Sequence, residues 1–403
     1  MSDRLPEATI PSRLVRLHLT RFRSYAALDF RPRARLAVLY GPNGSGKTNL
    51  LEAISLLVPG RGLRGARFAD LVRHGPEAGL GWGVHGTLEG PDGEAGRIEI
   101  ASGSAPAAPD RRVFRLNGEA PRSQAEIAAH LSVVWLTPQM ERLFQEPAAG
   151  RRRFLDRLVF ALEPGHAREI AAHDAAQGGR NRLLAAGGAD AAWLAGLEDA
   201  IARHAVAATV ARRALIARLN QLPAIAGGAF PKAVLSLACP IAAALDQSPA
   251  VLVEDQLRAA LAAERARDAA AGTALRGAQR ADLEIIEAAS STPARLCSTG
   301  EQKALLIGLI LGHAALIAAA RPAPPVLLLD EPAVHLDTDR RAALFAALAA
   351  GPAQALLTGT DAETFLPLAD YAAGFATGDG TLAADPRFGA RERLSAAPER
   401  PGA

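Results

Sequence analysis

A glycine-rich segment constrains this 403-residue chain more than any other feature. Residues 41–48 read GPNGSGKT and match the phosphate-binding loop pattern GxxxxGK[ST]. The mostly apolar residues 35–40 predict a buried strand before the loop, and residues 48–57 predict a helix after it. A phosphate-binding loop requires this context, because the glycines let backbone N–H groups turn inward and the helix N-terminus adds a positive dipole. The sequence therefore predicts an α/β nucleotide-binding domain.

Each residue of this loop has a predicted role in holding ATP. Lys47 would contact the β- and γ-phosphates, and the Thr48 hydroxyl would ligate Mg²⁺. The alternative is a glycine-rich loop with an incidental lysine, and the strand and helix on either side argue against it. The other predicted nucleotide contacts are Gly41, Pro42, Asn43, Gly44, Ser45 and Gly46.

A second motif supplies the acids that a nucleotide hydrolase needs. Residues 325–332 read PVLLLDEP, a buried strand that would deliver two carboxylates at its carboxyl end, where α/β sheets place their ligands. Asp330 is expected to hold Mg²⁺, directly or through water. Glu331 is the candidate for the base that polarises the attacking water. Two solvated acids at a strand end are the alternative.

The composition fits a globular protein that works in a reducing compartment. Hydrophobic residues make up 49% and charged residues 22%, and the formal net charge is only +3, so a nucleic-acid surface would need local clustering of cations. Cys239 and Cys297 lie far apart and form no CxxC pair, which predicts neither a disulfide nor a zinc site. Residues 304–320 lack charge but contain His313, so a core helix is expected in preference to a membrane span. We expect a cytoplasmic protein.

The pattern along the chain predicts a head domain divided by an inserted arm. Residues 1–144 are β-rich and contain the phosphate loop, with alternating strands such as residues 15–19 and 82–88. Residues 145–280 are rich in Ala, Leu and Arg at helical spacing and predict an α-helical arm. Residues 281–385 return to an α/β pattern and complete the head. A mobile tail is expected over residues 386–403.

A third motif narrows the class of ATPase. Residues 297–303 read CSTGEQK and resemble the signature motif of ABC ATPases, with Ser298, Gly300 and Gln302 at its characteristic positions. Ser298 and Glu301 are also spaced as a capping box, so a well-capped core helix is the alternative. Ser298 precedes Asp330 by 32 residues (330 − 298), a separation similar to that in ABC proteins. In that family the motif meets the γ-phosphate bound to a partner chain.

Two further positions agree with the ABC resemblance. Asp337 occupies the place of the D-loop and is expected to contact the nucleotide site across a dimer. Gln139 stands where the Q-loop joins head and arm, and it is a candidate Mg²⁺ or water contact, with an ordinary linker amide as the alternative. Residues 357–361 read LTGTD where ABC proteins have a switch histidine, so slow hydrolysis is expected.

The segments between these motifs resemble the RecF family over nearly the whole chain. The P-loop and the signature are separated by about 250 residues (298 − 48), more than in a transporter subunit and fewer than in a long coiled-coil protein. Two departures are visible: the family's usual GPHR element reads GAQR at residues 277–280, and its usual Asp-Asp pair reads Asp330-Glu331. The resemblance is carried by the segments LHLTRFRSY at 17–25, NLLEAI at 49–54, RLNG at 115–118, GRRRFLD at 150–156 and RNRLL at 180–184.

The resemblance implies an ATP-dependent DNA-binding protein of recombinational repair and replication restart. Two chains would form a head-to-tail homodimer around two ATP molecules and clamp duplex DNA or single-strand/double-strand junctions, mainly through phosphate contacts. Weak, DNA-stimulated hydrolysis would open the clamp. The implied partners are RecR and RecO, and the outcome is RecA loading, with no membrane involved. The alternatives are a transporter-type ATPase subunit and an interaction module that binds ATP without turnover.

Overall fold

The computed structural model describes residues 13–75, 79–90, 93–187 and 190–389. The chain divides into two compact units. Unit 1 comprises residues 1–140, 225–230 and 314–403, and unit 2 comprises residues 141–224 and 231–313. The finer division predicted from the sequence, with boundaries at residues 144, 280 and 385, stays a prediction. Most of the predicted tail, residues 390–403, lies outside the described residues.

Unit 1 contains a six-stranded sheet that positions the predicted nucleotide motifs. Its order is β14-β13-β3-β12-β11-β7, and β13, β3, β12, β11 and β7 are parallel neighbours. Every residue of β7, β11 and β12 is buried, as expected for strands inside a parallel sheet. The strands span Leu36–Tyr40 (β3), Val133–Leu136 (β7), Val326–Leu329 (β11), Gln354–Gly359 (β12), Ala372–Gly378 (β13) and Thr381–Asp385 (β14).

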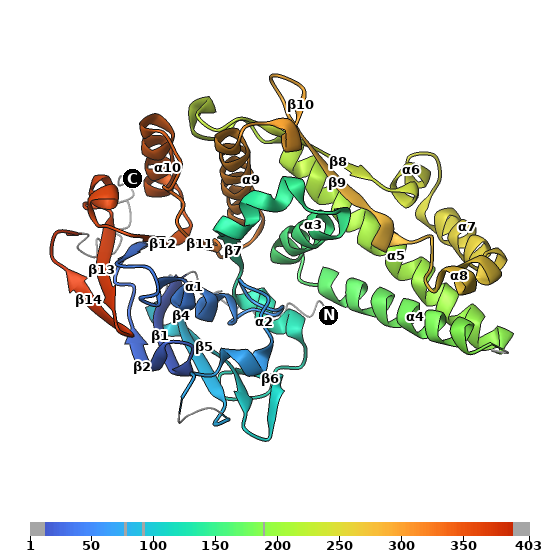
Figure 1. Ribbon diagram of the computed structural model, residues 1–403, viewed down its shortest axis with the longest axis horizontal. Helices are drawn as coiled ribbons and strands as arrows, with labels where there is room; N and C mark the ends of the chain where they lie inside the picture. Colours follow the sequence, from blue (N-terminus) through green and yellow to red (C-terminus); the bar gives the residue numbers. More distant parts are fainter. Residues whose placement is uncertain (1–12, 76–78, 91–92, 188–189, 390–403) are drawn as a thin grey trace, which may run out of the picture. The chain divides into compact units, whose positions relative to one another are not determined.

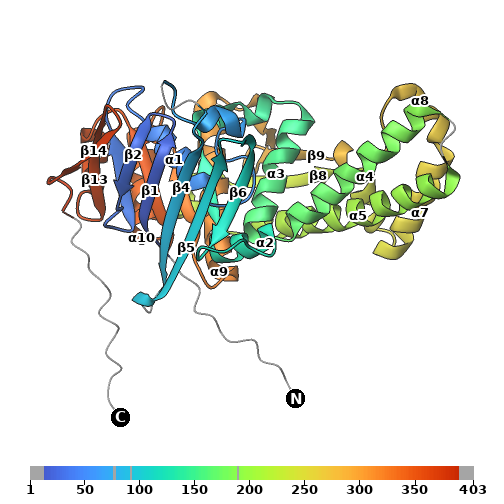
Figure 2. The same ribbon diagram turned by 90° about the horizontal axis from the view of Figure 1, so that it is seen from below.

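A second, antiparallel sheet completes the core of unit 1 (Figure 2). Its order is β2-β1-β4-β5-β6. Helix α1 (Lys47–Ser55), which follows the phosphate loop, contacts β1 and β4 of this sheet and β12 of the parallel sheet. One apolar cluster includes residues of both sheets and of α1, so the helix is anchored on two sides. The strands span Arg13–Phe22 (β1), Tyr25–Phe30 (β2), Trp82–Gly90 (β4), Gly93–Ala105 (β5) and Ala108–Leu116 (β6).

Helices α2 and α10 also lie within unit 1. Helix α2 (Gln124–His130) precedes β7, and α10 (Thr338–Ala350) lies between β11 and β12 in the sequence. Arg35, at the start of β3, donates hydrogen bonds to the carbonyls of Leu348 and Ala353 at 2.9 and 3.1 Å. A guanidinium at this place satisfies carbonyls that the end of α10 leaves without helical partners.

Unit 2 is mostly helical, as predicted for the arm, and it also contains a three-stranded sheet (Figure 1). Helices α4 and α5 run side by side, and α7 packs on α5. The sheet has the order β10-β9-β8. The helices span Ala148–Leu162 (α3), His166–Ala186 (α4), Ala191–Gln221 (α5), Pro240–Leu245 (α6), Ala250–Ala263 (α7) and Arg265–Ala271 (α8), and the strands span Ala233–Ala238 (β8), Asp282–Glu287 (β9) and Thr292–Pro293 (β10).

The strand β8 lies inside the range that the sequence analysis expected to be helical. Its residues AVLSLA are small and aliphatic, so they give no clear distinction between a helix and a strand. Pairing with β9 decides the outcome, with Leu235 opposite Ile285 and both residues buried. The strand therefore depends on a partner some fifty residues away in sequence, which local pattern does not reveal.

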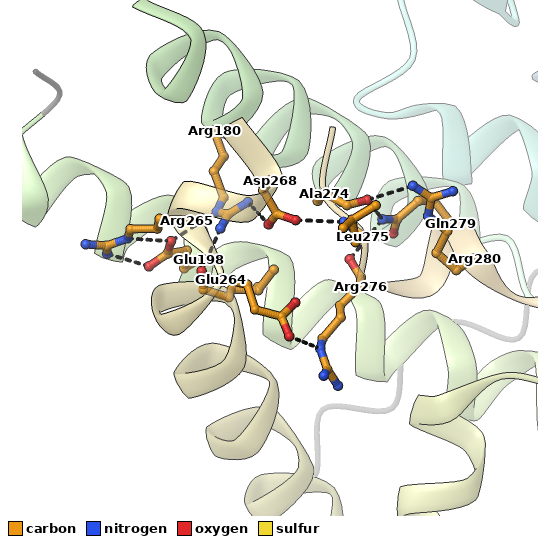
Figure 3. Close-up of polar contacts among 11 residues, drawn as sticks. Arg180, Glu198, Glu264, Arg265, Asp268, Ala274, Leu275, Arg276, Gln279 and Arg280 are labelled. Carbon is orange, nitrogen blue, oxygen red and sulfur yellow. Dashed lines mark hydrogen bonds and ion pairs between the residues drawn. The ribbon is translucent and has the colours of Figure 1, made fainter. Parts of the chain in front are cut away.

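A buried ion network ties the helices of unit 2 together (Figure 3). Arg180 of α4 is fully buried and donates to Glu198 of α5 at 3.0 Å, to Asp268 of α8 at 2.7 Å and to the carbonyl of Leu261 in α7 at 2.6 Å. Arg265 contacts the other oxygen of Glu198 at 2.6 Å. Arg180 belongs to the RNRLL segment, so this family-like element connects four helices.

Residues 277–280, where the sequence departs from the family pattern, form a tight turn beside that network. The Gln279 amide donates to the carbonyls of Ala274 and Arg276 at 3.2 and 2.9 Å, and Arg280 donates to Ala274 at 3.2 Å (Figure 3). Gly277 has φ 134°, a conformation that other residues rarely adopt. The glutamine that replaces the family's histidine thus closes the turn with its own side chain.

Of the helices in the described part of the chain, α9 (Thr299–Ala320) alone is long and apolar enough to cross a membrane. Its most apolar window has a mean hydropathy of 2.0, and 67% of that window is buried inside the protein. Burial on this scale agrees with the core helix predicted from the sequence, because a membrane span presents its apolar residues to lipid.

Candidate functional site

The phosphate loop leaves β3 and enters α1 through backbone conformations that require glycine. Gly41 and Gly46 have φ 148° and 102°. A Cβ at Gly41 would lie 2.5 Å from the Thr377 carbonyl oxygen, and one at Gly46 would lie 2.8 Å from the Tyr25 hydroxyl. Within the described residues, no side chain caps the N-terminus of α1. The first N–H groups of the helix and its dipole therefore face the loop, which is the arrangement that binds phosphate.

The Lys47 ammonium is held over the loop by backbone oxygens. Its Nζ donates to the carbonyls of Gly41 at 2.7 Å and Pro42 at 2.8 Å, and the residue is largely buried. Burial lowers the pKa of Lys47, and the charges of Glu331 and Asp330 oppose that shift. The cation is thus placed, with little freedom, beside the backbone groups that would surround a phosphate chain.

Two threonines and two acids meet where β11 and β12 end. The Thr48 hydroxyl donates to Asp330 Oδ1 at 2.9 Å, and the buried Thr358 hydroxyl donates to the same oxygen at 2.8 Å. The Glu331 backbone N–H donates to Thr358 Oγ1 at 2.9 Å. The two sequence motifs therefore converge, since β12 lies between β3 and β11 in the parallel sheet.

A shallow hollow lies over this cluster. It combines polar backbone from the phosphate loop with two basic side chains, Lys47 and Arg64, and one acidic side chain, Glu331. Glu331 is partly exposed and has φ 52°, so its backbone adopts a conformation that few non-glycine residues occupy. The hollow is lined by Asn43, Gly44, Gly46, Lys47, Thr48, Asn49, Arg64 and Glu331.

Ser45 and Pro42, which were predicted nucleotide contacts, have local roles in this structure. The Ser45 hydroxyl forms a 2.6 Å hydrogen bond with the Thr377 hydroxyl. Thr377 in turn donates to the Tyr40 carbonyl at 3.0 Å, so the bond ties the loop to β13 and β3. Pro42 contributes its carbonyl to Lys47. Both residues shape the loop through these bonds.

The N-terminal RFRSY segment braces the phosphate-loop helix. Arg23 forms a bidentate pair with the buried Glu52 at 2.9 and 3.0 Å, and Ser24 accepts a 3.0 Å bond from Asn49. The Tyr25 hydroxyl donates to the Gly46 carbonyl at 3.0 Å, and burial raises the pKa of Tyr25. The resemblance in this segment therefore has a physical basis, because its polar side chains form hydrogen bonds with the end of the phosphate loop and with helix α1.

The signature segment opens helix α9 with the predicted capping box. The Glu301 carboxylate accepts hydrogen bonds from the Ser298 N–H and hydroxyl, both at 2.8 Å. Ser298 is exposed, and a Cβ built on Gly300 would meet no heavy atom of the described chain within 4 Å beyond its own helix backbone. Gln302 is buried and donates to the Ala294 and Cys297 carbonyls at 3.0 and 3.1 Å. Gln302 thus supports the loop from inside, whereas Ser298 faces outward.

Gln139 and Asp337 occupy the ends of two structural elements. Gln139 is exposed and lies three residues beyond β7, whose Leu136 carbonyl accepts the Asp330 N–H at 2.9 Å. Gln139 therefore follows β7, the neighbour of β11, at the same end of the sheet as Asp330 and Glu331. Asp337 is the N-cap of α10 and accepts a 2.8 Å bond from the Arg340 N–H. The cap accounts for one of its oxygens and leaves the residue exposed.

The donor set fits Mg²⁺ bound together with a triphosphate. A hydroxyl and a carboxylate lie 2.9 Å apart at Thr48 and Asp330, and oxygen ligands of this kind suit a hard divalent cation. The adjoining loop supplies a lysine, glycine backbone and an uncapped helix end for the phosphates. Among the described residues, no group of three or more His, Cys, Asp or Glu side chains is placed to hold a metal ion.

Sequence reasoning missed Thr358 and Arg64. Thr358 ends the strand β12 in the LTGTD segment, and the pairing of β12 with β3 and β11 that brings it to the acids is not encoded in any local pattern. Arg64 follows α1 in a loop without motif character, and its 2.7 Å bond to the Asn49 side chain appears only in the folded chain.

The fold and the site together define an ABC-type ATPase head. The family model described as the RecF/RecN/SMC N-terminal domain matches residues 13–378. A structure titled as the recombination mediator RecF with ATPrS is similar to this chain, with a TM-score of 0.79 at 21% identity, covering 94% of this chain and 99% of that one. An Smc head domain from Pyrococcus furiosus has a TM-score of 0.52 at 16% identity, covering 92% of this chain and 95% of that one.

Closer relatives give the particular family. The DNA replication and repair protein RecF of Mesorhizobium japonicum is 47% identical over 372 residues, which cover 91% of this chain and 96% of that protein. RecF of Agrobacterium fabrum is 46% identical over 374 residues, covering 92% and 98%. The chain belongs to the RecF family. The resemblance noted in the sequence is confirmed, and the transporter-type alternative is set aside.

Proposed function

We propose that this chain is an ATP-dependent DNA-binding protein of recombinational repair and replication restart. The observation that carries the proposal is the convergence of Lys47, Thr48, Asp330 and Glu331 on one hollow, in a chain whose relatives are named DNA replication and repair proteins. ATP bound there would be held by the phosphate loop. The head would comprise residues 1–144 and 281–385, with residues 145–280 as its arm.

The residues of the hollow divide the chemistry between binding and hydrolysis. The phosphate loop and Lys47 neutralise and orient the phosphate chain, and Thr48 with Asp330 would hold Mg²⁺. Bound Mg²⁺ would polarise the terminal phosphate and offset its developing charge. Glu331 would accept a proton from the attacking water, and Gln139 would orient that water or the metal from the neighbouring strand end. The absence of a switch histidine at residues 357–361 supports a weak ATPase.

The signature segment supports a site completed by a second copy of the chain. Ser298 is exposed at the N-terminus of a 22-residue helix, and space is open in front of Gly300. No contact among the described residues requires glycine there, so we infer that the space is kept for a phosphate bound to a partner. Ser298 and Gly300 would contact the γ-phosphate, and Asp337 would reach across the same interface. Gln302 would act by fixing the loop.

The homodimer would clamp duplex DNA or a junction and release it after DNA-stimulated hydrolysis. DNA contacts would be made to phosphates by Arg and Lys side chains, because a net charge of +3 requires local clusters and not a uniformly basic surface. RecR and RecO are the proposed protein partners, RecA loading is the proposed outcome, and the proposed location is the cytoplasm. The relatives' repair names support this assignment.

One experiment tests the core of the proposal. Light scattering would size the purified protein with and without ATP, Mg²⁺ and duplex DNA, and phosphate release would be measured in parallel. We expect monomers without ATP, dimers with ATP, and DNA retention only with ATP. A protein that binds ATP and dimerises without releasing phosphate would be an ATP-gated interaction module. A protein that retains DNA equally without ATP would contradict the clamp.

A further inference from the structure

We propose that Thr358 is a positioning residue of the ATPase site, which sets the orientation of both acids at the end of β11. The inference rests on the proposed function, because it names the residue that prepares Asp330 and Glu331 for metal binding and hydrolysis. The single hydroxyl of Thr358 contacts both residues, donating to one and accepting from the other.

The bond to Asp330 restricts which carboxylate oxygen is available to a cation. Thr358 Oγ1 donates to Asp330 Oδ1 at 2.8 Å, and Thr48 donates to the same oxygen at 2.9 Å. Two donors on Oδ1 fix the rotation of the carboxylate and direct Oδ2 away from them. Hydrogen bonds of this kind to a metal-binding carboxylate orient the ligand and typically govern metal affinity.

The bond to Glu331 stabilises an unusual backbone conformation. Glu331 has φ 52°, which an L-residue adopts only at some cost in free energy. The Glu331 N–H donates to Thr358 Oγ1 at 2.9 Å, so the conformation is tied to the neighbouring strand. The direction in which the Glu331 side chain leaves the backbone follows from this conformation. Thr358 therefore affects the proposed base through its backbone.

The end of β12 presents its polar groups to the site through Thr358. Gly359, the next residue, has no room for a side chain, since a Cβ there would lie 2.3 Å from Phe365. Thr360 is exposed and donates to its own neighbour Asp361 at 3.0 Å. A histidine is absent from residues 357–361, and Thr358, fully buried, is the side chain of this segment that reaches the acids.

A purely structural role is the competing explanation, because a buried threonine in a strand also satisfies polar groups of the core. The two explanations differ in what removal of the hydroxyl would change. A structural role predicts lower thermal stability with unchanged Mg²⁺ dependence in the folded protein. A positioning role predicts weaker Mg²⁺ affinity, and hence a higher Mg²⁺ requirement, together with slower turnover in protein that remains folded.

The test compares Thr358→Val, which removes the hydroxyl at nearly constant shape, with Thr358→Ser, which keeps it. Fluorescent ATP binding would be titrated in EDTA and in Mg²⁺, and phosphate release would be measured across a Mg²⁺ series. We expect Thr358→Val to bind ATP in EDTA like wild type, to need roughly 10- to 100-fold more Mg²⁺, and to turn over roughly 10- to 100-fold more slowly. Thr358→Ser should recover most of both losses.

Thr209→Val is the matched control, since Thr209 is a fully buried threonine of α5 whose hydroxyl donates to the Ala205 carbonyl at 2.8 Å. It should change stability without changing Mg²⁺ dependence. If Thr358→Val does not fold, Thr358→Ala and Thr358→Ser decide, because both shorten the side chain and only serine keeps the hydroxyl. Wild-type Mg²⁺ dependence and turnover in Thr358→Val, or equal values in the alanine and serine variants, would overturn the inference. Failure of wild-type protein to bind ATP would instead overturn the proposed function.

Discussion

The Lys47 ammonium lies within 2.8 Å of two carbonyl oxygens of its own loop, and that geometry limits what can replace it. Lys47→Ala should weaken ATP binding by roughly 10- to 100-fold or more, because charge-assisted hydrogen bonds to the phosphates are lost. Isothermal titration calorimetry would measure the change. Lys232→Ala is the control, because Lys232 immediately precedes β8 in unit 2. This variant should bind ATP like wild type. Near-normal affinity in Lys47→Ala would refute the assignment.

Glu331 has the geometry of a base at the rim of the hollow, because it is partly exposed beside Lys47 and Thr48. Glu331→Gln should bind ATP and dimerise but release phosphate roughly 100- to 10,000-fold more slowly, since an amide does not accept the proton of water. Single-turnover phosphate release with ATP in excess of its dissociation constant separates turnover from binding. Unchanged release would exclude Glu331 as the base and redirect attention to Asp330.

At the residue scale, the sequence located the two motifs that the fold brings together and missed the contacts between them; the chemical roles assigned to their residues stay predictions. Lys47, Thr48, Asp330 and Glu331 belong to two short patterns, and the fold brings them together as expected. The role of Thr358 depends on which strand lies between β3 and β11, which no local pattern encodes. Gln302 fits the signature pattern, yet its amide faces the interior, because the preceding turn offers two carbonyls.

At the scale of elements, the Arg180 network determines how α4 meets α5, α7 and α8 (Figure 3). Removal of one partner from a buried pair leaves uncompensated charge, so Arg180→Ala should lower the free energy of unfolding by about 3–5 kcal/mol. Urea unfolding followed by circular dichroism would measure it. Arg182→Ala changes an exposed arginine of the same helix and should cost less than about 0.5 kcal/mol. Equal stability of the two variants would show that the network is dispensable.

Asp156 in α3 is paired with Arg212 in α5, both in unit 2. This pair predicts that the free energy of unfolding depends on pH. Burial alone would raise the pKa of Asp156, but hydrogen bonds from His166 and Arg212, at 2.8 and 2.7 Å, outweigh it and lower the pKa below its ordinary value. A lowered pKa stabilises the folded state above the unfolded-chain value of about 3.9, and the contribution is lost as pH falls below it. The stability difference between wild type and Asp156→Asn should therefore shrink as the pH falls below about 4.

Urea unfolding at a series of pH values would measure that difference. Asp255→Asn, at an exposed pair with Arg258, is the control and should differ little from wild type at any pH. A difference between wild type and Asp156→Asn that persists unchanged to about pH 2 would contradict the depressed pKa.

Element prediction succeeded where hydrophobic pattern and motif agreed, as at β3, α1 and β11. It failed at β8, because an alanine-rich strand is distinguished from a helix only by its pairing with β9. It also passed over β7, four apolar residues whose strand character comes from parallel pairing with β11. Long-range pairing supplied the missing information in both places.

At the scale of the whole molecule, the exposed Ser298 and the lack of atoms within 4 Å of a Cβ at Gly300 support the proposed contact of the signature segment with another chain. Within one chain, the capping box with Glu301 already satisfies the helix N-terminus. Gly300 is thus explained by the proposed dimer better than by the fold of the chain itself.

Ser298→Arg should leave ATP binding by the monomer nearly intact while blocking ATP-driven dimerisation and DNA retention. In the proposed dimer, Lys47 and Thr48 would capture the nucleotide from one chain, whereas a bulky side chain at residue 298 would obstruct the approach of the other. Calorimetry would measure binding, and light scattering with ATP would measure dimerisation. Loss of ATP binding by the monomer, or wild-type dimerisation, would contradict a site shared by two chains.

A mixture of Ser298→Arg with Lys47→Ala sharpens this test, because the two lesions fall on opposite sides of each proposed site. In a mixed dimer, one site contains both lesions and the other contains neither. The mixture should therefore recover partial ATP-driven dimerisation, although each variant alone stays monomeric. Recovery is expected only if every site takes its lysine from one chain and its serine from the other. If both variants fold and dimerisation does not recover, the shared-site hypothesis is wrong. Residues 297–303 are then explained as the start of a capped core helix.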